Sequence, residues 1–463
     1  MWPSLTSCRW LRMAHRNETI MKHCCCALIW VCAVAAQAAD FDSEKLQNWH
    51  QWRGPESTGV APLGNPPVQW DEDTNIRWKA EIPGAGSSTP IIWGDQVFIL
   101  TAVKTDRQEE APPAEVGTVP GGNPFRIQRP THYYQFIVMC LNRRTGDVEW
   151  QHLANEQVPH EGSHHDHGFA SGSPTTDGKH LFASFGSRGL YCYDMDGNLK
   201  WDRDFGQMKM IRWFGEAVSP VLDGDSLFVN TDHEGQSLLL SLDAETGETK
   251  WQVDREEQSS WVAPLVVERE GRKQVIVNSN LKARGYDFET GDVLWECGGQ
   301  TLAIIPMPVA TEELVFCMSG YPKSALFAIP LDAEGDITDS DAIAWQRDRD
   351  TPYCPSPLLY GDRLYFNKTN SAILTCLDAA TGDTIIEKQR LQRLKKIYAS
   401  PVGAADRVYF VGRDGTTTVL KNSAEYEVLA TNELDAEIDA SPAIVGDELF
   451  LRGKKHLYSI VAN

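Results

Sequence analysis

One unit of about 44 residues recurs along most of this 463-residue chain, and such a period is diagnostic of repeat folds. The clearest copy opens with Ser219-Pro220, continues through Leu242-Asp243 and Thr246-Gly247-Glu248, and ends at Trp251. The dipeptide that opens the unit, a residue followed by proline, occurs at Thr89-Pro90, Ser173-Pro174, Ser219-Pro220, Ala263-Pro264, Met307-Pro308, Ser356-Pro357, Ser400-Pro401 and Ser441-Pro442.

Each unit predicts four strands, which we call A to D. Proline is tolerated at the first residue of a strand but not in its middle, so the dipeptide marks the start of strand A. Asp-Gly or Gly-Asp turns lead into strand B, and the Thr-Gly turn joins strands C and D as a hairpin. A four-stranded unit of this period is typical of a propeller blade. We therefore predict an all-β fold: a single eight-bladed β-propeller of four-stranded blades over residues 75–463.

The last unit ends one strand short, at Leu457-Tyr458-Ser459-Ile460. The segment from Asn75 to Glu81 lies before the first blade and carries a blade-ending tryptophan, Trp78. A ring with two free edges would aggregate, so closure requires a strand from the other end of the chain. We predict that this N-terminal strand completes the last blade.

The first 38 residues are predicted to be a leader with a signal peptide. A basic start at Met21-Lys22-His23 precedes an apolar run that ends in Ala36-Gln37-Ala38, the small-residue pattern of a cleavage site. The apolar run is too short to cross about 30 Å of hydrocarbon. We expect a periplasmic or secreted protein with no transmembrane anchor, and leave open whether Met1 or Met21 is the start. Residues 39–74 form an N-terminal extension.

The net charge and the cysteine pattern argue against a nucleic-acid-binding protein, a zinc or dithiol site and a disulfide-rich fold. The chain has 64 acidic and 43 basic side chains, a net charge of −21, and such a surface repels nucleic-acid phosphates. The chain has no CxxC pair, which argues against a zinc or dithiol site. Cys140, Cys192 and Cys376 occupy one repeat slot in different blades, too far apart to pair, so no disulfide framework is expected. We expect a monomer that has no nucleic-acid partner.

The unit resembles the pyrroloquinoline-quinone-like (PQQ-like) repeat, which occurs in quinoprotein alcohol dehydrogenases and in the outer-membrane protein assembly factor B family. Trp52-Arg53-Gly54-Pro55 and the end from Leu451 to Tyr458 also resemble secreted propellers of planctomycete-type bacteria. The resemblance implies a propeller and, through the assembly factor, a scaffold at the inner side of the outer membrane. The leader departs from the lipoprotein pattern, because Trp30-Val31 precedes Cys32.

Resemblance to the quinoproteins implies another function, a dehydrogenase with its quinone in the central channel. Those enzymes cover the quinone with a disulfide between adjacent cysteines and hold calcium beside a catalytic aspartate. Here the adjacent cysteines, Cys24 to Cys26, lie in the leader, and no haem-attachment CxxCH occurs. We therefore do not expect PQQ, and no catalytic residue is assigned.

The strand count determines which loops share a rim. Loops D–A and B–C crowd one rim, whereas the short A–B and C–D turns crowd the other. A B–C insertion in blade 1, about residues 105–131, falls on the first rim and is either a binding loop or disordered. Propeller ligands generally bind at such a rim of longer loops.

The D–A loop into blade 2 is rich in imidazole and carboxylate groups, which are ligands for zinc or copper. A B–C loop of the next blade adds a histidine beside two acids, Asp232-His233-Glu234. The alternative is a solvated polar loop. The candidate ligands for a divalent metal are His160, His164, His165, Asp166, His167 and His233.

Aromatic residues precede several A strands and are candidates for stacking on a sugar or anchoring a peptide. They are Phe169, Trp213, Trp261, Tyr353 and Tyr398. The alternative for each is packing between blades. Two rim cations, Arg255 and Arg452, are candidates for an anionic ligand. The tryptophans that end the blades, such as Trp251, are expected to be structural.

These features favour an exported, non-catalytic module that binds a protein partner or a carbohydrate-like ligand at the channel rim. The alternative is a quinone- or metal-dependent oxidoreductase that uses the channel.

Overall fold

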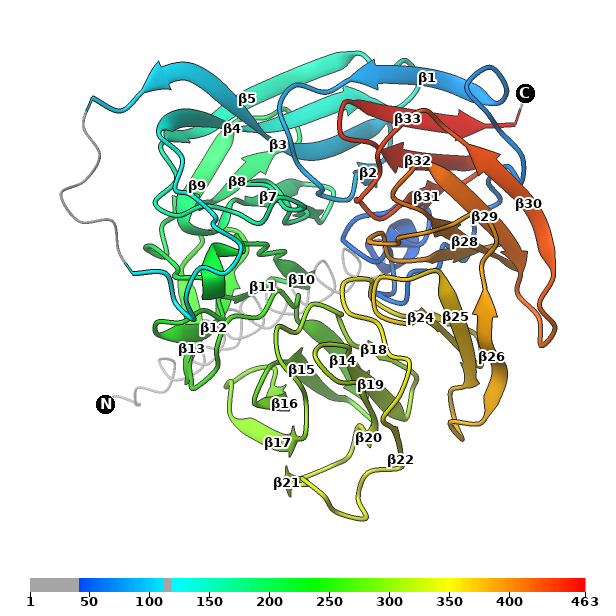
Figure 1. Ribbon diagram of the computed structural model, residues 1–463. Helices are drawn as coiled ribbons and strands as arrows, with labels where there is room; N and C mark the ends of the chain where they lie inside the picture. The colour runs from blue at the N-terminus through cyan, green and yellow to red at the C-terminus, as the bar shows by residue number, and fades with distance from the viewer. Residues whose placement is uncertain (1–40, 111–117, 463) are drawn as a thin grey trace, which may run out of the picture. The chain divides into compact units, whose positions relative to one another are not determined.

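The computed structural model describes residues 41–110 and 118–462. The chain divides into two units, residues 1–45 and 46–463, and the larger unit contains a ring of eight sheets (Figure 1). The predicted leader therefore lies outside the described residues. None of the helices in the described ranges is long and apolar enough to span a bilayer.

The first four blades contain consecutive antiparallel strands. Their strands are β2 (Ile91–Trp93), β3 (Gln96–Gln108), β4 (His132–Asn142) and β5 (Val148–Gln157); β6 (Thr175–Thr176), β7 (His180–Ser184), β8 (Leu190–Asp194) and β9 (Leu199–Arg203); β10 (Val221–Asp223), β11 (Ser226–Asn230), β12 (Ser237–Asp243) and β13 (Thr249–Arg255); β14 (Leu265–Arg269), β15 (Arg272–Asn278), β16 (Lys282–Asp287) and β17 (Val293–Gly298). A short strand, β21 (Gly335–Asp336), adds to blade 4 in parallel with β17.

The remaining blades follow the same order, and the last one recruits β1. Their strands are β18 (Val309–Ala310), β19 (Leu314–Ser319), β20 (Ala325–Pro330) and β22 (Trp345–Arg347); β23 (Leu358–Tyr360), β24 (Arg363–Asn367), β25 (Ile373–Asp378) and β26 (Thr384–Arg390); β27 (Val402–Ala404), β28 (Arg407–Val411), β29 (Thr416–Lys421) and β30 (Val428–Glu433); β31 (Ala443–Val445), β32 (Glu448–Arg452), β33 (His456–Val461) and β1 (Ile76–Glu81).

The eight-bladed ring and its closure are confirmed. Strand β1 pairs antiparallel with β33, and Trp78 lies opposite Ser459. In Figure 1 the blue β1 lies beside the red β33. Two parts of the chain more than 370 residues apart therefore share one sheet, and the backbone groups at the edge of β33 are paired rather than exposed.

The repeated Thr-Gly turn and the repeated tryptophan form one joint between neighbouring blades. The Trp201 Nε1 donates a hydrogen bond to the Ala244 carbonyl of the next blade, at 3.1 Å. Gly247 of that blade has φ +72°, and a Cβ there would lie 2.7 Å from the Trp201 ring. The same arrangement joins Trp251 to Gly291. Glycine is therefore required twice over, by the left-handed backbone and by the close approach of the ring.

The serine of the opening dipeptide connects blades around the channel. The Ser356 backbone N–H donates to the Ser400 hydroxyl at 2.9 Å, and the Ser400 N–H donates in turn to the Ser441 hydroxyl at 3.0 Å. Blades 1 to 3 repeat the pattern from Thr89 through Ser173 to Ser219. Each serine thus satisfies a backbone donor of the preceding blade at the point where strand A begins.

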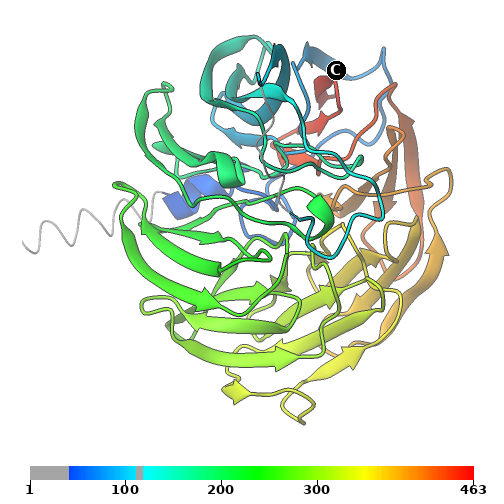
Figure 2. The same ribbon diagram turned by 60° about the vertical axis from the view of Figure 1, so that its left-hand side comes forward.

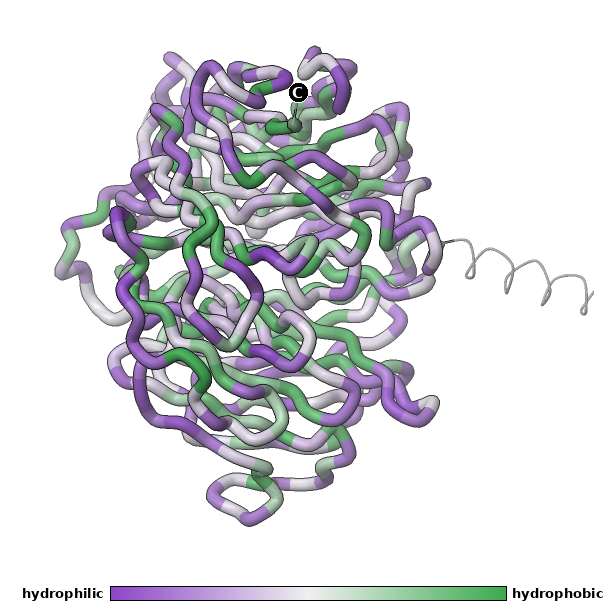
Figure 3. The backbone as a smooth tube through the Cα atoms, turned by 90° about the vertical axis from the view of Figure 1, so that its right-hand side faces the viewer, coloured by the Kyte–Doolittle hydropathy of each residue, from purple (hydrophilic) through white to green (hydrophobic). Residues whose placement is uncertain are grey.

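In blade 3, strands A to C are mostly buried, whereas strand D alternates between exposed and half-buried residues. Figure 3 shows hydrophilic residues, in purple, and hydrophobic residues, in green, interspersed along the backbone. All six cysteines in the described ranges are free thiols, and five of them are buried.

Residues 46–74 of the N-terminal extension cross the rim of the A–B and C–D turns. Trp49 pairs with Ile92 of blade 1, and Val60 forms a bridge with Gly403 of blade 7. The buried Arg53 donates hydrogen bonds to the Pro401 carbonyl at 2.9 Å and to the Pro357 carbonyl at 2.8 Å. The extension therefore links blades that are distant along the ring, which the sequence did not reveal.

Candidate functional site

A cavity of about 320 Å³ occupies the channel on the rim of the D–A and B–C loops. This volume lies at the lower end of the range of small-ligand sites. Its base includes the hydroxyl-bearing residues that open the blades, among them Ser173, Ser219, Ser400 and Ser441. Trp52 of the N-terminal extension lines the cavity and lies 3.5 Å from the Ser441 hydroxyl through its Nε1. The cavity therefore has a floor formed by the extension.

Aromatic rings from four blades and the insertion form the wall. Trp261 lies in a D–A loop and donates its indole N–H to the Gly215 carbonyl at 2.7 Å. The Tyr353 ring packs at a tilt against Tyr321, with 5.2 Å between ring centroids. Phe125 of the insertion packs edge-on against Phe214 at 5.3 Å. Rings held by such contacts are rigid and offer apolar area at low entropic cost.

A charged network also borders the cavity. The Arg413 guanidinium pairs with Asp166 and also with Asp439, at 3.0 Å. Burial raises the pKa of Asp166, but hydrogen bonds from Arg413 and Tyr398 more than offset this and hold that pKa below its usual range. Burial raises the pKa of Asp439 to about 6 despite the nearby arginine. Both cavity carboxylates are thus tied to one cation.

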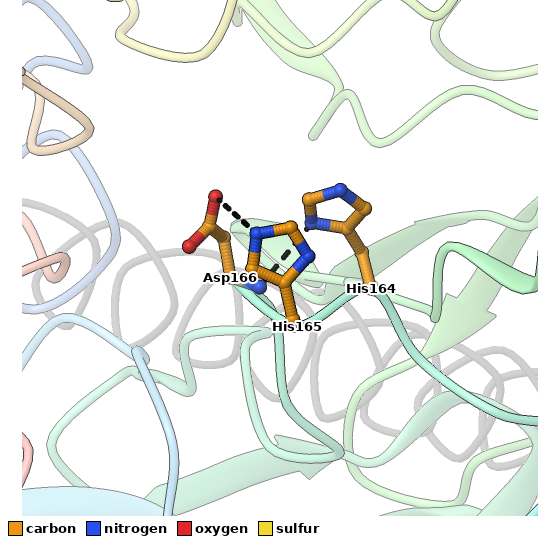
Figure 4. Close-up of side chains that lie close together, drawn as sticks. All are labelled: His164, His165 and Asp166. Atoms are coloured by element: carbon orange, nitrogen blue, oxygen red, sulfur yellow. Dashed lines mark hydrogen bonds and ion pairs between the residues drawn. The ribbon is translucent and has the colours of Figure 1, made fainter. Parts of the chain in front are cut away.

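The structure brings three of the six predicted metal ligands together. One nitrogen or oxygen of His164, His165 and Asp166 lies within 4.8 Å of the others (Figure 4). The His164 Nδ1 accepts the Asp166 N–H at 3.2 Å, and the His165 Nε2 lies 3.4 Å from the Asp166 carboxylate. Burial lowers the pKa of His164, so the imidazole is neutral at pH 7 and able to bind a metal.

A second group forms around His160, which stands apart from the cavity. Its Nε2 lies 2.7 Å from the Met208 carbonyl. It shares a polar cluster with Glu161 and Glu216, and Glu216 is bound by Arg188 at 2.7 Å. Burial raises the pKa of Glu161 to about 8. His160, Glu161 and Glu216 thus also bring one ligand atom each within 4.8 Å of the others, with Glu216 already paired with Arg188.

The remaining two predicted ligands lie elsewhere. Both ring nitrogens of His233 contact backbone groups. Its Nδ1 accepts the Lys209 N–H at 3.0 Å, and its Nε2 lies 3.0 Å from the Gln236 carbonyl. His167 lines the cavity, but its Nδ1 lies 2.8 Å from the Gly168 carbonyl, and burial lowers its pKa to about 4.

The two predicted rim cations are both buried and engaged. Arg255 donates to the Asp232 carboxylate at 2.9 Å and to Ser279 at 2.6 Å. Arg452 donates to the Ser88 carbonyl at 3.1 Å and the Leu100 carbonyl at 2.7 Å. These arginines link neighbouring strands and do not line the cavity.

The five predicted rim aromatics separate into two groups. Trp261, Tyr353 and Tyr398 line the cavity. Phe169 packs edge-on against Tyr134 at 5.0 Å, and Trp213 is buried outside the lining residues. All five precede their A strands, but at different distances from the proline, and three of the five line the cavity.

Sequence reasoning missed several lining residues, chiefly Trp52, Arg212, Phe214 and Tyr321. The motif around Trp52 is visible in the sequence, but no periodicity places it inside the ring. Arg212 lies in the short η2 helix (Ile211–Trp213) with φ 53°. The Arg212 N–H donates to the Pro120 carbonyl of the insertion at 2.7 Å. Figure 2 shows the cyan insertion reaching these green loops.

A model of the family described as outer membrane protein assembly factor BamB matches residues 135–385 and 297–461, which together span most of the chain. This chain belongs to the BamB family. The curated proteins contain no match.

Solved structures agree on the fold. The chain is similar to BamB from Moraxella catarrhalis, with 14% identity and a TM-score of 0.51, over 78% of this chain and 99% of that one. It is also similar to the computationally designed Ika8 protein, with 10% identity and a TM-score of 0.53, over 86% of this chain and 100% of that one. At these identities the likeness concerns architecture alone.

Proposed function

We propose that this chain is a periplasmic or secreted, non-catalytic binding module that holds a segment of a protein partner in the mouth of its channel. The observation that carries the proposal is the aromatic cavity of about 320 Å³, open at the rim of longer loops and floored by Trp52. Clustered rigid aromatics with a few polar groups are typical of anchor sites for peptide side chains. Membership of a family named for an assembly factor supports a protein ligand.

The charges in the cavity support binding rather than catalysis. Asp166 and Asp439 both pair with Arg413, so neither carboxylate is free to act as a nucleophile. A quinone that carries several carboxylates would need several unpaired cations. Arg413 is already engaged by these two acids and by Glu437. The residues present do not fit such a cofactor.

A divalent ion at His164, His165 and Asp166 is the second candidate, favoured by the convergence of their ligand atoms. An ion there would compete with Arg413 for Asp166. A thermal-shift titration with Zn²⁺ tests this candidate: an increase in Tm that is lost in His164→Ala, but not in His132→Ala, would establish a metal site.

The proposed function is tested by site-specific photo-crosslinking in native cells. Probes are placed at Phe125 and Tyr321, which are 50% and 45% exposed and line the cavity. The control probe at Leu199 is equally exposed and apolar but lies at the start of the outer strand β9. We expect one discrete protein adduct from the two mouth probes and none from Leu199. Equal labelling at all three sites would contradict the proposal, as would turnover of an alcohol on addition of quinone and calcium.

A further inference from the structure

The guanidinium of Arg212 is an unpaired cation at the cavity. Arg212 lines the cavity, and its Nε is inaccessible to solvent without a hydrogen-bond partner. Within residues 41–110 and 118–462, no acidic side chain forms an ion pair with it, in contrast to Arg413. Arg212 is the one arginine among the described residues that line the cavity, so its charge is available to an acidic ligand.

The backbone holds Arg212 in this position at a cost. Arg212 and Trp213 both adopt left-handed backbone angles, with φ 53° and 57°. Such conformations cost a non-glycine residue about 1–3 kcal/mol each and persist where the surrounding structure determines them. Here the Arg212 N–H is bound by the Pro120 carbonyl, and the Ile211 N–H is bound by the Ser259 hydroxyl at 2.8 Å. Contacts from two other loops therefore fix the backbone that carries the Arg212 side chain.

Apolar side chains surround the same mouth. Phe125 and Tyr321 line the cavity and are about half exposed. Leu302, 51% exposed, is next to Tyr321, because its backbone N–H donates to the Tyr321 carbonyl at 2.9 Å. Exposed leucine and phenylalanine side chains suit apolar peptide side chains better than sugar hydroxyls, which need polar partners.

We infer that the cavity takes a peptide segment in which a carboxylate side chain is flanked by apolar or aromatic residues, with Arg212 as the carboxylate's partner. This inference rests on the proposed function and names the chemistry of the partner. The guanidinium supplies paired donors that match a carboxylate, and the surrounding rings exclude water from the pair. Trp261 and Tyr353 contact the flanking side chains. The acidic surface of the whole chain opposes an acidic peptide at long range, so any preference for the carboxylate comes from this local cation.

The test compares two probes on the full chain by fluorescence anisotropy. One is the labelled peptide Gly-Ser-Phe-Glu-Phe-Ser-Gly with blocked ends, and the other carries Gln in place of Glu. We expect the Glu peptide to bind roughly tenfold more tightly, which corresponds to about 1.4 kcal/mol, because a hydrogen bond between two charged groups is stronger than one to a neutral amide. Arg212→Met should abolish this preference while leaving Tm within a few degrees, and Arg212→Lys should retain part of it.

Two controls separate the inference from the proposed function. Arg144→Met removes an exposed arginine in the C–D turn of blade 1, on the opposite rim, and should leave the preference intact. Tyr321→Ser should weaken both peptides equally. Equal binding of the two peptides would overturn the inference but leave the proposed function standing. Binding of neither peptide at millimolar concentration, or tighter binding of an oligomeric uronic acid, would also overturn the inference.

Discussion

Single glycines determine how closely two blades approach. Gly247 has a left-handed backbone and lies under the Trp201 ring, whereas Gly224 in the same blade has φ +59° and open space, with nothing within 4 Å of where a Cβ would lie. We expect Gly247→Ala to lower the free energy of unfolding by about 2–4 kcal/mol, because it adds a steric clash to backbone strain. Gly224→Ala should cost about 1 kcal/mol from strain alone. Urea denaturation measures both, and equal losses would show that the ring contact contributes nothing.

The carboxyl group of Glu161 should make stability depend on pH. Burial raises its folded-state pKa from 4.5 to about 8, so the folded protein binds this proton more tightly than the unfolded chain. The stability it contributes is complete below about pH 4.5 and is lost as the pH rises to about 8. Glu161→Gln should flatten this dependence by up to about 1.4 kcal/mol per pH unit in that window. The control Glu256→Gln changes an exposed carboxyl and should run parallel to the wild type.

At the scale of elements, the N-terminal extension acts as a brace across the ring. Arg53 is 1% exposed and binds carbonyls that precede strands of blades 6 and 7. We expect Arg53→Met to cost roughly 2–4 kcal/mol, because two buried carbonyl groups lose their donors. Arg144→Met, at a side chain 74% exposed, should stay within about 0.5 kcal/mol. A loss below 1 kcal/mol for Arg53→Met would show that the extension is only loosely attached.

The strands were predictable because their signals recur. Proline marks the start of strand A in every blade, and the Thr-Gly turn marks the C–D hairpin. Where the pattern is weak in one repeat, the other repeats therefore show where its strands begin and end. The loops that build the cavity carry no such period. Trp261 and Trp213 both precede their A strands, yet only Trp261 lines the cavity, and Trp213 lies in a loop where two consecutive residues have left-handed backbone angles. The repeat assigns Arg255 to the correct blade, but a single sequence could not show its partner Asp232.

For the whole molecule, the decisive contact is between the two ends of the ring. D–A loops that lead into all eight blades line the cavity, and the pairing of β1 with β33 closes the ring that positions these loops. A chain that begins after Ile82 would lose β1, leave the edge of β33 unpaired and also lose the extension with Trp52 and Arg53. A chain that begins at Leu46 keeps both the extension and every strand of the ring. We expect the shorter chain to associate through its free edge and to lose peptide binding at the mouth, because an unpaired strand edge templates pairing with another chain. Size-exclusion chromatography with light scattering measures the association, and anisotropy with the peptide that contains Glu measures the binding. A monomeric, binding-competent chain without β1 would show that the seven intact blades hold the cavity without closure.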